Sequence, residues 1–306
     1  MTSLSILTAT DLSAAAQHAV DRGFLLAAET GAPYSVVHAI ELDAVDSLRE
    51  ALGSGAPEIK QRLEEQAREE LARLVGEPSR HQGVAADAQV VVGAPLTVIL
   101  SHAEAIGAGL LILGASGEAA LRHILLGSTA WRLLRKQTSR PVLVVKQPPA
   151  GPYQRLLIAI DFSPISAAAI RLGKQLAPAA DIVLLHAFDV PFEGKLARAG
   201  VEESVLHDYR RLARTESMRR LHQLAEAAGL APGSYWSLAL HGDPFHQIIS
   251  REQEQGCDLI IVGKQGQHVV EELLLGSVTK HVLAESRCDV LVLAKGLPSQ
   301  EEEFSI

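Results

Sequence analysis

The sequence predicts an α/β protein built from two doubly wound domains, each with a five-stranded parallel sheet and helices on both faces. Three observations support this. The chain has 306 residues, about two domains at ~150 residues each. Each half contains five short runs rich in Val, Ile and Leu, as expected of parallel strands that are buried on both faces. The two halves also repeat one another.

The repeat keeps a nearly constant spacing along the chain. Asp11 and Asp161 are 150 residues apart, Gly114 and Gly263 are 149 apart, and the histidines at 38 and 186 are 148 apart. Such a constant offset indicates duplication of one domain. Within each half, apolar runs alternate with longer stretches of helical periodicity, which gives right-handed strand–helix–strand units.

The expected strands are the apolar runs themselves. In the first half they lie near 4–9, 34–40, 87–92, 110–114 and 142–145. In the second half they lie near 155–160, 181–188, 235–240, 259–263 and 290–293.

Four helices are expected in each half. Ser13 and Ser163 precede Ala-rich stretches and are predicted helix N-caps. Pro95 and Pro244 fit the first turn of the third helix, where a missing N–H costs nothing. The longest helices are expected at about 57–75 and 203–228. In the latter, apolar residues recur at helical spacing: Val205, Leu206, Tyr209, Leu212 and Leu221.

These elements predict four segments along the chain. Residues 1–146 form the first domain and 153–296 the second. Between them, the Pro-rich stretch 147–152 cannot be helix or central strand and is the expected linker. Residues 297–306 form an acidic tail.

Composition excludes several functional classes. The net charge of −8 argues against a nucleic-acid partner, which requires a basic face. The two cysteines make neither a disulfide framework nor a zinc knuckle. No apolar run approaches the roughly 20 residues that cross a bilayer, and the first residues do not resemble a signal peptide. The expected location is the cytoplasm, with no membrane partner.

One glycine pattern occurs twice and predicts phosphate binding. It is Gly-x-x-Gly, nine residues, then Gly-Ser, and it follows the fourth strand of each half. Glycine lets backbone N–H groups approach a phosphate, and a helix N-terminus adds further donors with a favourable dipole. The pattern is neither a Walker A loop nor Gly-x-Gly-x-x-Gly. Its glycines are Gly114, Gly117 and Gly127, then Gly263, Gly266 and Gly276.

An aspartate ends the first strand of each half. In doubly wound sheets ligands bind beyond the carboxyl ends of the strands, so Asp11 and Asp161 are expected to face the glycine loops. There a carboxylate would grip a ribose hydroxyl, an adenine amine or a metal. The alternative is that each Asp-x-Ser simply makes a turn and a helix cap.

The residues after the last glycine begin the fourth helix, as Ser128-Thr129 and Ser277-Val278-Thr279. Their amides and hydroxyls are expected to hold a phosphate; the alternative is ordinary capping by serine. Lys264 lies inside the second loop, where a cation suits a triphosphate, and a solvent-facing side chain is the alternative.

These motifs together resemble the universal stress protein family, in two copies that cover essentially the whole chain. The resemblance implies Rossmann-like domains with strand order 3-2-1-4-5, and ATP binding by members that carry this loop, with Mg²⁺ left open. It implies pairing of domains through strands 142–145 and 290–293, leaving homodimerisation and unknown protein partners open. The site residues it implies are Thr10, Asp11, Ala39, Gly114, Gly117, Gly127, Ser128, Thr129, Asp161, Ala187, Gly263, Lys264, Gly266, Gly276, Ser277 and Val278.

The motifs predict binding more clearly than catalysis. Neither loop offers a clear catalytic base, and hydrolysis needs groups that position water and stabilise charge. Three hypotheses stay open: a nucleotide-binding stress-response module, a slow ATPase or self-phosphorylating enzyme, and a scaffold with another ligand. Acidic Glu271 and Glu272 follow the second loop, where the first has Arg122 and His123, so the two sites are expected to differ.

Histidines invite a metal hypothesis, which the sequence does not favour. His38 and His186 end apolar strands, where hydrogen-bonded core histidines are expected. His241 and His246 flank Asp243, but the first half has no equivalent group. No metal site is predicted.

Overall fold

The computed structural model describes residues 4–41, 56–115, 126–136, 139–266 and 275–294. They divide into two compact units, one that extends to Pro152 and one that begins at Tyr153. Each unit is described by itself below.

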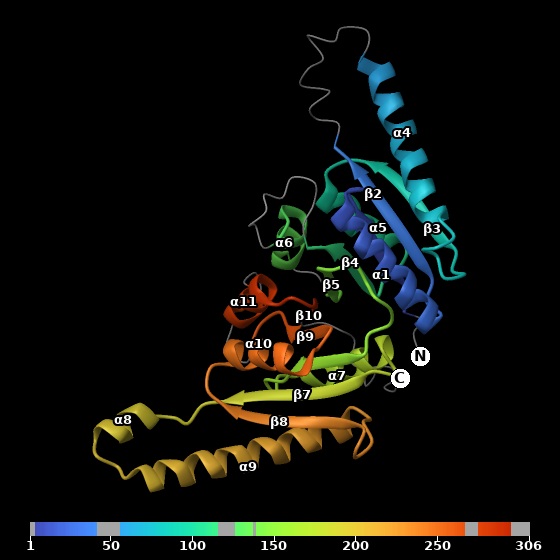
Figure 1. The fold of residues 1–306 in the computed structure, drawn as a ribbon. Helices are drawn as coiled ribbons and strands as arrows, with labels where there is room; N and C mark the ends of the chain where they lie inside the picture. Colours follow the sequence, from blue (N-terminus) through green and yellow to red (C-terminus); the bar gives the residue numbers. More distant parts are fainter. Residues whose placement is uncertain (1–3, 42–55, 116–125, 137–138, 267–274, 295–306) are drawn as a thin grey trace, which may run out of the picture. The chain divides into compact units, whose positions relative to one another are not determined.

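In its described residues, the first unit contains five parallel strands and four helices. Figure 1 shows their arrangement. Its strands are β1 (Ile6–Thr10), β2 (Tyr34–Ile40), β3 (Ala86–Val92), β4 (Leu110–Gly114) and β5 (Val142–Val145). Its helices are α1 (Ala14–Thr30), α4 (Ala56–Gly76), α5 (Pro95–Ala105) and α6 (Ser128–Arg135).

The described residues of the second unit follow the same order and include a short helix between the second strand and the longest helix. Its strands are β6 (Arg155–Ala159), β7 (Asp181–Phe188), β8 (Tyr235–His241), β9 (Leu259–Gly263) and β10 (Asp289–Leu293). Its helices are α7 (Ile165–Leu176), α8 (Glu193–Arg198), α9 (Glu203–Ala227), α10 (Pro244–Gln255) and α11 (Ser277–Glu285).

The strand order is 3-2-1-4-5 in both units, as expected. It reads β3-β2-β1-β4-β5 in the first and β8-β7-β6-β9-β10 in the second. The central strand of each sheet pairs in parallel on both sides: Ile6 lies opposite both Tyr34 and Leu110, and Leu156 opposite both Ile182 and Leu259. Strand order therefore reverses beside β1 and beside β6, which is where such sheets bind ligands.

The central strands form the cores because they are apolar on both faces. Leu110 to Leu113 and Leu259 to Val262 are all buried. In the second unit α10 packs against α11, and α7 against α9, so each face of the sheet carries a pair of helices. At ~25 cal/mol per Å² of apolar surface removed from water, this burial is the main stabilising term.

Most predicted helix ends are confirmed, and one is wrong. The Ser13 side chain accepts a hydrogen bond from the Ala16 N–H and caps α1, and Pro95 and Pro244 begin α5 and α10. Ser163 does not cap α7. Pro164 follows it in helical conformation, so the chain already turns there, and the Ser163 hydroxyl is buried without a partner among the described residues.

The short helix α8 was not predicted. It has no buried residue, so it lacks the apolar periodicity on which a helix prediction rests. An acidic first turn (Glu193) and basic last turn (Lys195, Arg198) are its only sequence signals.

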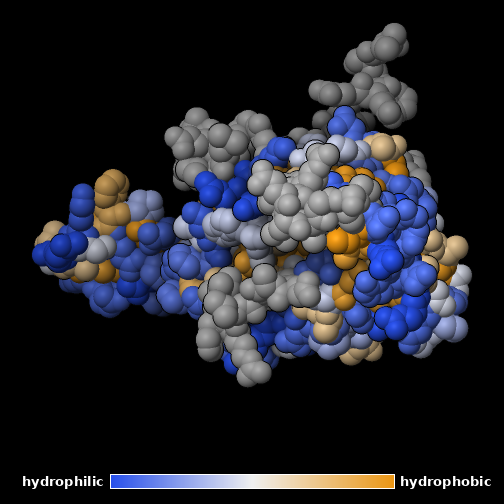
Figure 2. Space-filling model, turned by 90° about the horizontal axis from the view of Figure 1, so that it is seen from above, coloured by the Kyte–Doolittle hydropathy of each residue, from blue (hydrophilic) through white to orange (hydrophobic). Residues whose placement is uncertain are grey.

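Helix α9 has the predicted length but buries less than its pattern indicates. Of the five periodic apolar residues, Leu206 and Leu221 are buried, whereas Val205, Tyr209 and Leu212 are exposed. Phe192, just before α8, is exposed as well. In Figure 2, the end of the second unit that carries α8 accordingly shows hydrophobic residues among hydrophilic ones.

Candidate functional site

A cavity of about 370 Å³ opens at the carboxyl ends of β6, β7 and β9 in the second unit. This volume is within the range of small-ligand sites. The strand ends, the start of α10, the glycine loop and the first turn of α11 form its wall. The lining residues are Ala159, Ile160, Asp161, Leu185, His186, Ala187, Pro244, Ile248, Val262, Gly263, Gln265, Gly266, Gly276, Ser277, Val278 and Thr279.

The structure brings most of the second-half site residues together at this cavity. Seven of the eight that the resemblance implies belong to the lining: Asp161, Ala187, Gly263, Gly266, Gly276, Ser277 and Val278. They come from four elements that are distant in sequence, and the sheet topology is what places them side by side.

Asp161 makes the turn and also faces the glycine loop. Its Oδ1 accepts hydrogen bonds from the Ser163 N–H at 2.9 Å and from the Ser166 hydroxyl at 3.0 Å. Its Oδ2 lies 4.0 Å from the position that a Cβ on Gly266 would occupy. One carboxylate oxygen is thus used by the turn, and the other is directed towards the loop.

The loop is closed by its own backbone. The Gly276 N–H donates to the Lys264 carbonyl at 2.9 Å. A Cβ on Gly276 would lie 3.3 Å from that oxygen, and one on Gly263 would lie 3.3 Å from the Gln265 carbonyl. Both distances are tighter than ordinary contacts, so the close backbone approach accounts for glycine at these positions.

The first turn of α11 begins at the cavity without a side-chain cap. Gly276 is the N-cap residue and offers no side chain, and Ser277 is the first helical residue. Gly127 and Ser128 take the same places at α6. Capping by Ser128 or Ser277 is therefore wrong, because both serines lie one position too late. The first N–H groups of a helix have no intrahelical partner and favour an anion.

Lys264 does not line the cavity. It is only 5% exposed, so the alternative of a solvent-facing side chain is wrong. Its backbone ties the loop to the sheet, since its N–H donates to the Leu293 carbonyl.

His38 and His186 are hydrogen-bonded at the strand ends, as predicted. Nδ1 of His38 lies 2.8 Å from the Thr10 carbonyl oxygen, and Nδ1 of His186 lies 2.8 Å from that of Ile160. A carbonyl only accepts, so Nδ1 carries the proton and Nε2 is an acceptor in the neutral ring. Burial lowers the pKa of His186, which keeps the ring neutral.

The residue after each aspartate has a left-handed backbone. Leu12 has φ of 66° and Phe162 has φ of 59°. Such values are uncommon for residues other than glycine. The Phe162 ring packs on His186 with centroids 4.4 Å apart, and the Arg220 guanidinium lies 3.9 Å from the Phe162 ring centroid.

In the first unit the structure describes the edges of the corresponding site. Thr10 ends β1 and is buried, and its hydroxyl oxygen accepts a hydrogen bond from the Leu12 N–H. Asp11 Oδ1 accepts hydrogen bonds from the N–H and the hydroxyl of Ser13. Ala39 is on β2, Gly114 ends β4, and the Gly127 N–H donates to the Ala115 carbonyl. Thr129 is in the first turn of α6. Gly117, Arg122 and His123 lie outside the described residues, as do Glu271 and Glu272 in the second unit.

Comparison with known families decides the identity. The model of the universal stress protein family matches this chain twice, over residues 4–146 and 152–294. The chain belongs to the universal stress protein family. The duplication in the sequence is therefore a tandem of two family domains.

Curated relatives match this universal stress protein one domain at a time. Universal stress protein YxiE of Bacillus subtilis is 29% identical over 146 residues, which is 46% of this chain and 99% of that protein. A universal stress protein of Thermus aquaticus is 32% identical over 145 residues, which is 46% of this chain and 98% of that protein.

A solved structure of a universal stress protein from Archaeoglobus fulgidus matches both domains. It has a TM-score of 0.65 and 20% identity, and it covers 97% of this chain and 100% of that one. At this identity the likeness concerns the fold alone.

Several lining residues of the cavity were not among the predicted site residues. Gln265 is one of them, and it lies within the Gly-x-x-Gly motif, which could have indicated it. Thr279 was expected to offer its amide and hydroxyl to a phosphate, but its hydroxyl is used inside the protein. The Thr279 hydroxyl donates to the Gly263 carbonyl at 2.6 Å. Ile248 is one turn after Pro244 in α10, and no local signal indicates that this turn faces the cavity.

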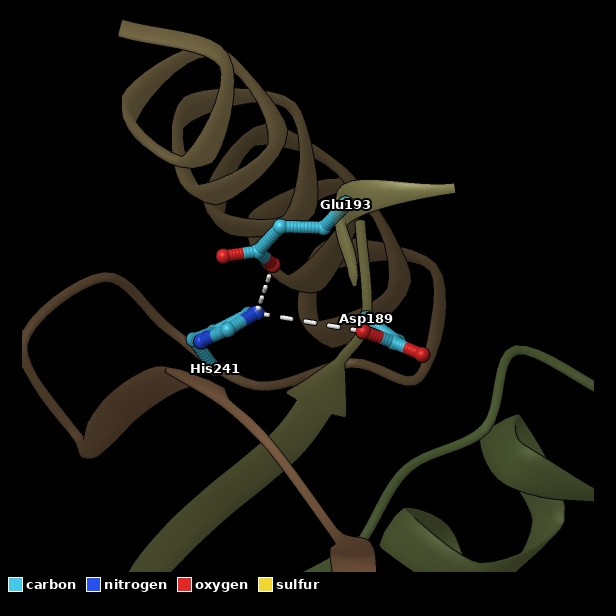
Figure 3. A group of neighbouring side chains, drawn as sticks. All are labelled: Asp189, Glu193 and His241. Carbon is cyan, nitrogen blue, oxygen red and sulfur yellow. Dashed lines mark ion pairs between the residues drawn. The ribbon is translucent and has the colours of Figure 1, made fainter. Parts of the chain in front are cut away.

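The structure places His241, at the end of β8, with other residues than those named in the metal hypothesis. Asp243 caps α10 by accepting from the His246 N–H at 3.1 Å, so these two residues serve the helix. His241 instead lies with Asp189 and Glu193 (Figure 3).

None of the helices in the described part of the chain is both long and apolar enough to cross a membrane.

Proposed function

We propose that this universal stress protein binds ATP in the cavity of its second domain and acts as a nucleotide-dependent module of a stress response. One observation carries the proposal: the uncapped first turn of α11 and a carboxylate oxygen of Asp161 are on the wall of the same cavity. A ligand with an anionic end and a hydrogen-bond-donating end fits both groups.

The phosphates belong at the glycine loop. The N–H groups of Ser277, Val278 and Thr279 are the first of α11, and the helix dipole favours negative charge there by about 0.3–1 kcal/mol. The Ser277 side chain is exposed and adds a hydroxyl donor. A Cβ at Gly276 would crowd the backbone of the glycine loop, at 3.3 Å from the Lys264 carbonyl oxygen and 3.5 Å from Gln265 Cα.

The nucleoside belongs at the strand ends. Ile160, Leu185, Ala187, Ile248 and Val262 supply an apolar wall for a base. Asp161 Oδ2 can accept from ribose hydroxyls or from the adenine amine, and neutral His186 offers Nε2 as a second acceptor. In this arrangement the hydrogen-bond acceptors of the cavity face the ribose hydroxyls and the adenine amine, which are the hydrogen-bond donors of ATP.

Binding without rapid turnover is the function that this lining favours. Among the described lining residues the titratable side chains are Asp161 and His186, and neither lysine nor arginine belongs to the lining. Phosphoryl transfer relies on cations to stabilise the transferring group. Where Mg²⁺ accompanies the nucleotide, Asp161 is the carboxylate of the lining that could contact it.

We extend the proposal to the first domain by the internal repeat. Thr10, Asp11, Ala39, Gly114, Gly117, Gly127, Ser128 and Thr129 would hold a second ATP. Gly127 and Ser128 support this, since they begin α6 as Gly276 and Ser277 begin α11.

A pair of serine variants tests both sites. Ser277→Asp places a carboxylate where the phosphate is proposed to bind, so it should repel the nucleotide. The variant should not destabilise α11, because an acidic residue in the first turn interacts favourably with the helix dipole. Ser128→Asp is the matched change in the first domain, since both serines are exposed first residues of a helix. Titration calorimetry with ATP is expected to give two sites in the native chain and one in each variant.

Nucleotide released from the purified protein, identified by mass spectrometry, provides an independent measurement. Intact ATP that persists over hours supports a binding module. If native protein neither contains nor binds nucleotide, or if Ser277→Asp binds ATP as the native chain does, the proposal for the second domain is wrong.

A further inference from the structure

Three potential metal ligands converge beyond the carboxyl ends of β7 and β8 (Figure 3). Nε2 of His241 lies 2.8 Å from Glu193 Oε2 and 3.8 Å from Asp189 Oδ1. The three ligand atoms all lie within 4.8 Å of one another. They come from separate segments: the end of β8, the first residue of α8 and the residue after β7.

Neighbouring groups hold two of these ligands in place. Glu193 uses Oε1 for Arg210 on α9, whose Nε donates to it at 2.6 Å, and this leaves Oε2 directed at His241. Asp189 Oδ1 accepts from the Val190 N–H at 2.8 Å. Outer partners of this kind orient the ligands of metal sites.

The spacing matches that of ligands around one ion. Nitrogen and oxygen ligands lie about 2.0–2.2 Å from Zn²⁺, so neighbouring ligands are separated by roughly 3.0 Å at right angles and 3.4 Å in a tetrahedron. The two separations from His241 Nε2, 2.8 and 3.8 Å, fall on either side of these values, and all three ligand atoms lie within 4.8 Å of one another. Rotation of the side chains would bring the three ligands to one ion.

We propose that Asp189, Glu193 and His241 form a binding site for a divalent transition-metal ion of the Zn²⁺ class. One imidazole and two carboxylates favour such an ion over Mg²⁺ or Ca²⁺, which take oxygen ligands. The Asp189 side chain is 89% exposed, so water can complete the coordination.

The ion would fasten α8 to the sheet. Helix α8 has no buried residue, and Glu193 is its ion-pairing link both to α9, through Arg210, and to β8, through His241. A metal ion held by all three ligands would cross-link the β7 end, α8 and the β8 end. Its predicted effect is local order in residues 189–198.

Calorimetric titration of the full chain with ZnCl₂, without nucleotide, tests the site. Glu193→Gln removes a ligand, and Glu203→Gln is its control, because Glu203 also pairs with Arg210 but lies outside the cluster. His241→Gln and exposed His246→Gln form a second pair. We expect Glu193→Gln and His241→Gln to weaken Zn²⁺ binding by about tenfold or more, and both controls to retain it.

Hydrogen exchange provides a readout at the site itself. Zn²⁺ should slow exchange in residues 190–198 of the native chain and of Glu203→Gln, but not of Glu193→Gln, and Mg²⁺ or Ca²⁺ should have no such effect. Zn²⁺ binding that is absent, or that is equal in native chain and His241→Gln, would overturn the proposal. The cluster would then be an ion pair between His241 and its carboxylates.

Discussion

The hydroxyl of Ser166, in the first turn of α7, donates a hydrogen bond to Asp161 Oδ1 across 3.0 Å. Ser166 is buried, so this bond fixes the carboxylate that faces the proposed nucleotide. Ser166→Ala is expected to weaken ATP binding to the second domain severalfold, in line with the ~1 kcal/mol of one hydrogen bond. The dissociation constant from calorimetry measures this.

Ser163→Ala is the control for that variant. It also removes a buried hydroxyl, but one without a hydrogen-bond partner among the described residues, and it keeps the backbone N–H that donates to Asp161. Equal losses of affinity in the two variants would contradict the role given to Ser166.

Gly23 and Gly173 occupy equivalent positions in the two halves of the chain. Their substitution by alanine is expected to lower the free energy of unfolding by unequal amounts. A Cβ on Gly23 would lie 2.3 Å from the hydroxyl oxygen of Tyr34, which is buried and hydrogen-bonded to Thr8 and to the Val20 carbonyl. A Cβ on Gly173 would lie 2.8 Å from Ile261 Cδ1, the end of a flexible side chain. Gly23→Ala should therefore cost about 3 kcal/mol or more and Gly173→Ala about 1 kcal/mol. Urea unfolding compares them, and a reversed order would contradict the packing described.

The second domain should lose stability in mild acid through His186. Burial lowers the pKa of His186 below its ordinary value of 6.5, so the unfolded chain binds a proton more readily than the folded one. The contribution is present above about pH 6.5 and declines as the pH falls towards the folded pKa. His186→Gln should reduce the stability difference between pH 7.5 and 5.5, measured by urea unfolding. Exposed His246→Gln should leave that difference unchanged, and the same difference in all three proteins would contradict the prediction.

Glu252 is expected to be a buried anchor for the start of β10. Its Oε1 accepts from the backbone N–H groups of Arg287 at 2.6 Å and Cys288 at 2.8 Å. Glu252→Ala leaves both donors without this acceptor and should cost about 2–4 kcal/mol. Exposed Glu254→Ala removes surface contacts with Ser250 and Arg251 and should change stability by less than about 0.5 kcal/mol. Thermal unfolding of both variants checks this, and similar midpoints would show that Glu252 is not an anchor.

The sheet could be predicted from the sequence because its signals are local. The apolar runs mark the strands to within two residues, and Pro95 and Pro244 mark helix starts that the structure confirms. The duplication gave a second test of each expected element, since a strand or helix in one half is expected at the matching position of the other. Ser163 shows the limit: it matches Ser13 in the repeat, but Pro164 changes the backbone there and removes the cap.

The lining of the cavity was only partly predictable because much of it depends on topology. The glycine motif and Asp161 are visible as patterns, whereas Ile248 reaches the cavity only because α10 packs beside β6 and β7. The proximity of His241 to Asp189 and Glu193 also depends on the topology of the domain. Its residues are more than 45 positions apart at the extremes, and α8, which supplies Glu193, has no apolar pattern to reveal it.

The left-handed residues Leu12 and Phe162 bear on the history of the molecule. A non-glycine residue in this conformation is strained by about 1–3 kcal/mol, and both copies retain it at the same position after the strand-end aspartate. The simplest account is that the strained turn existed in the single-domain ancestor. The side chain at that position has since changed, to leucine in one copy and phenylalanine in the other, while the path of the main chain has not. What the two copies inherited in common at this turn is therefore a backbone shape, on which each has been free to evolve its own contacts.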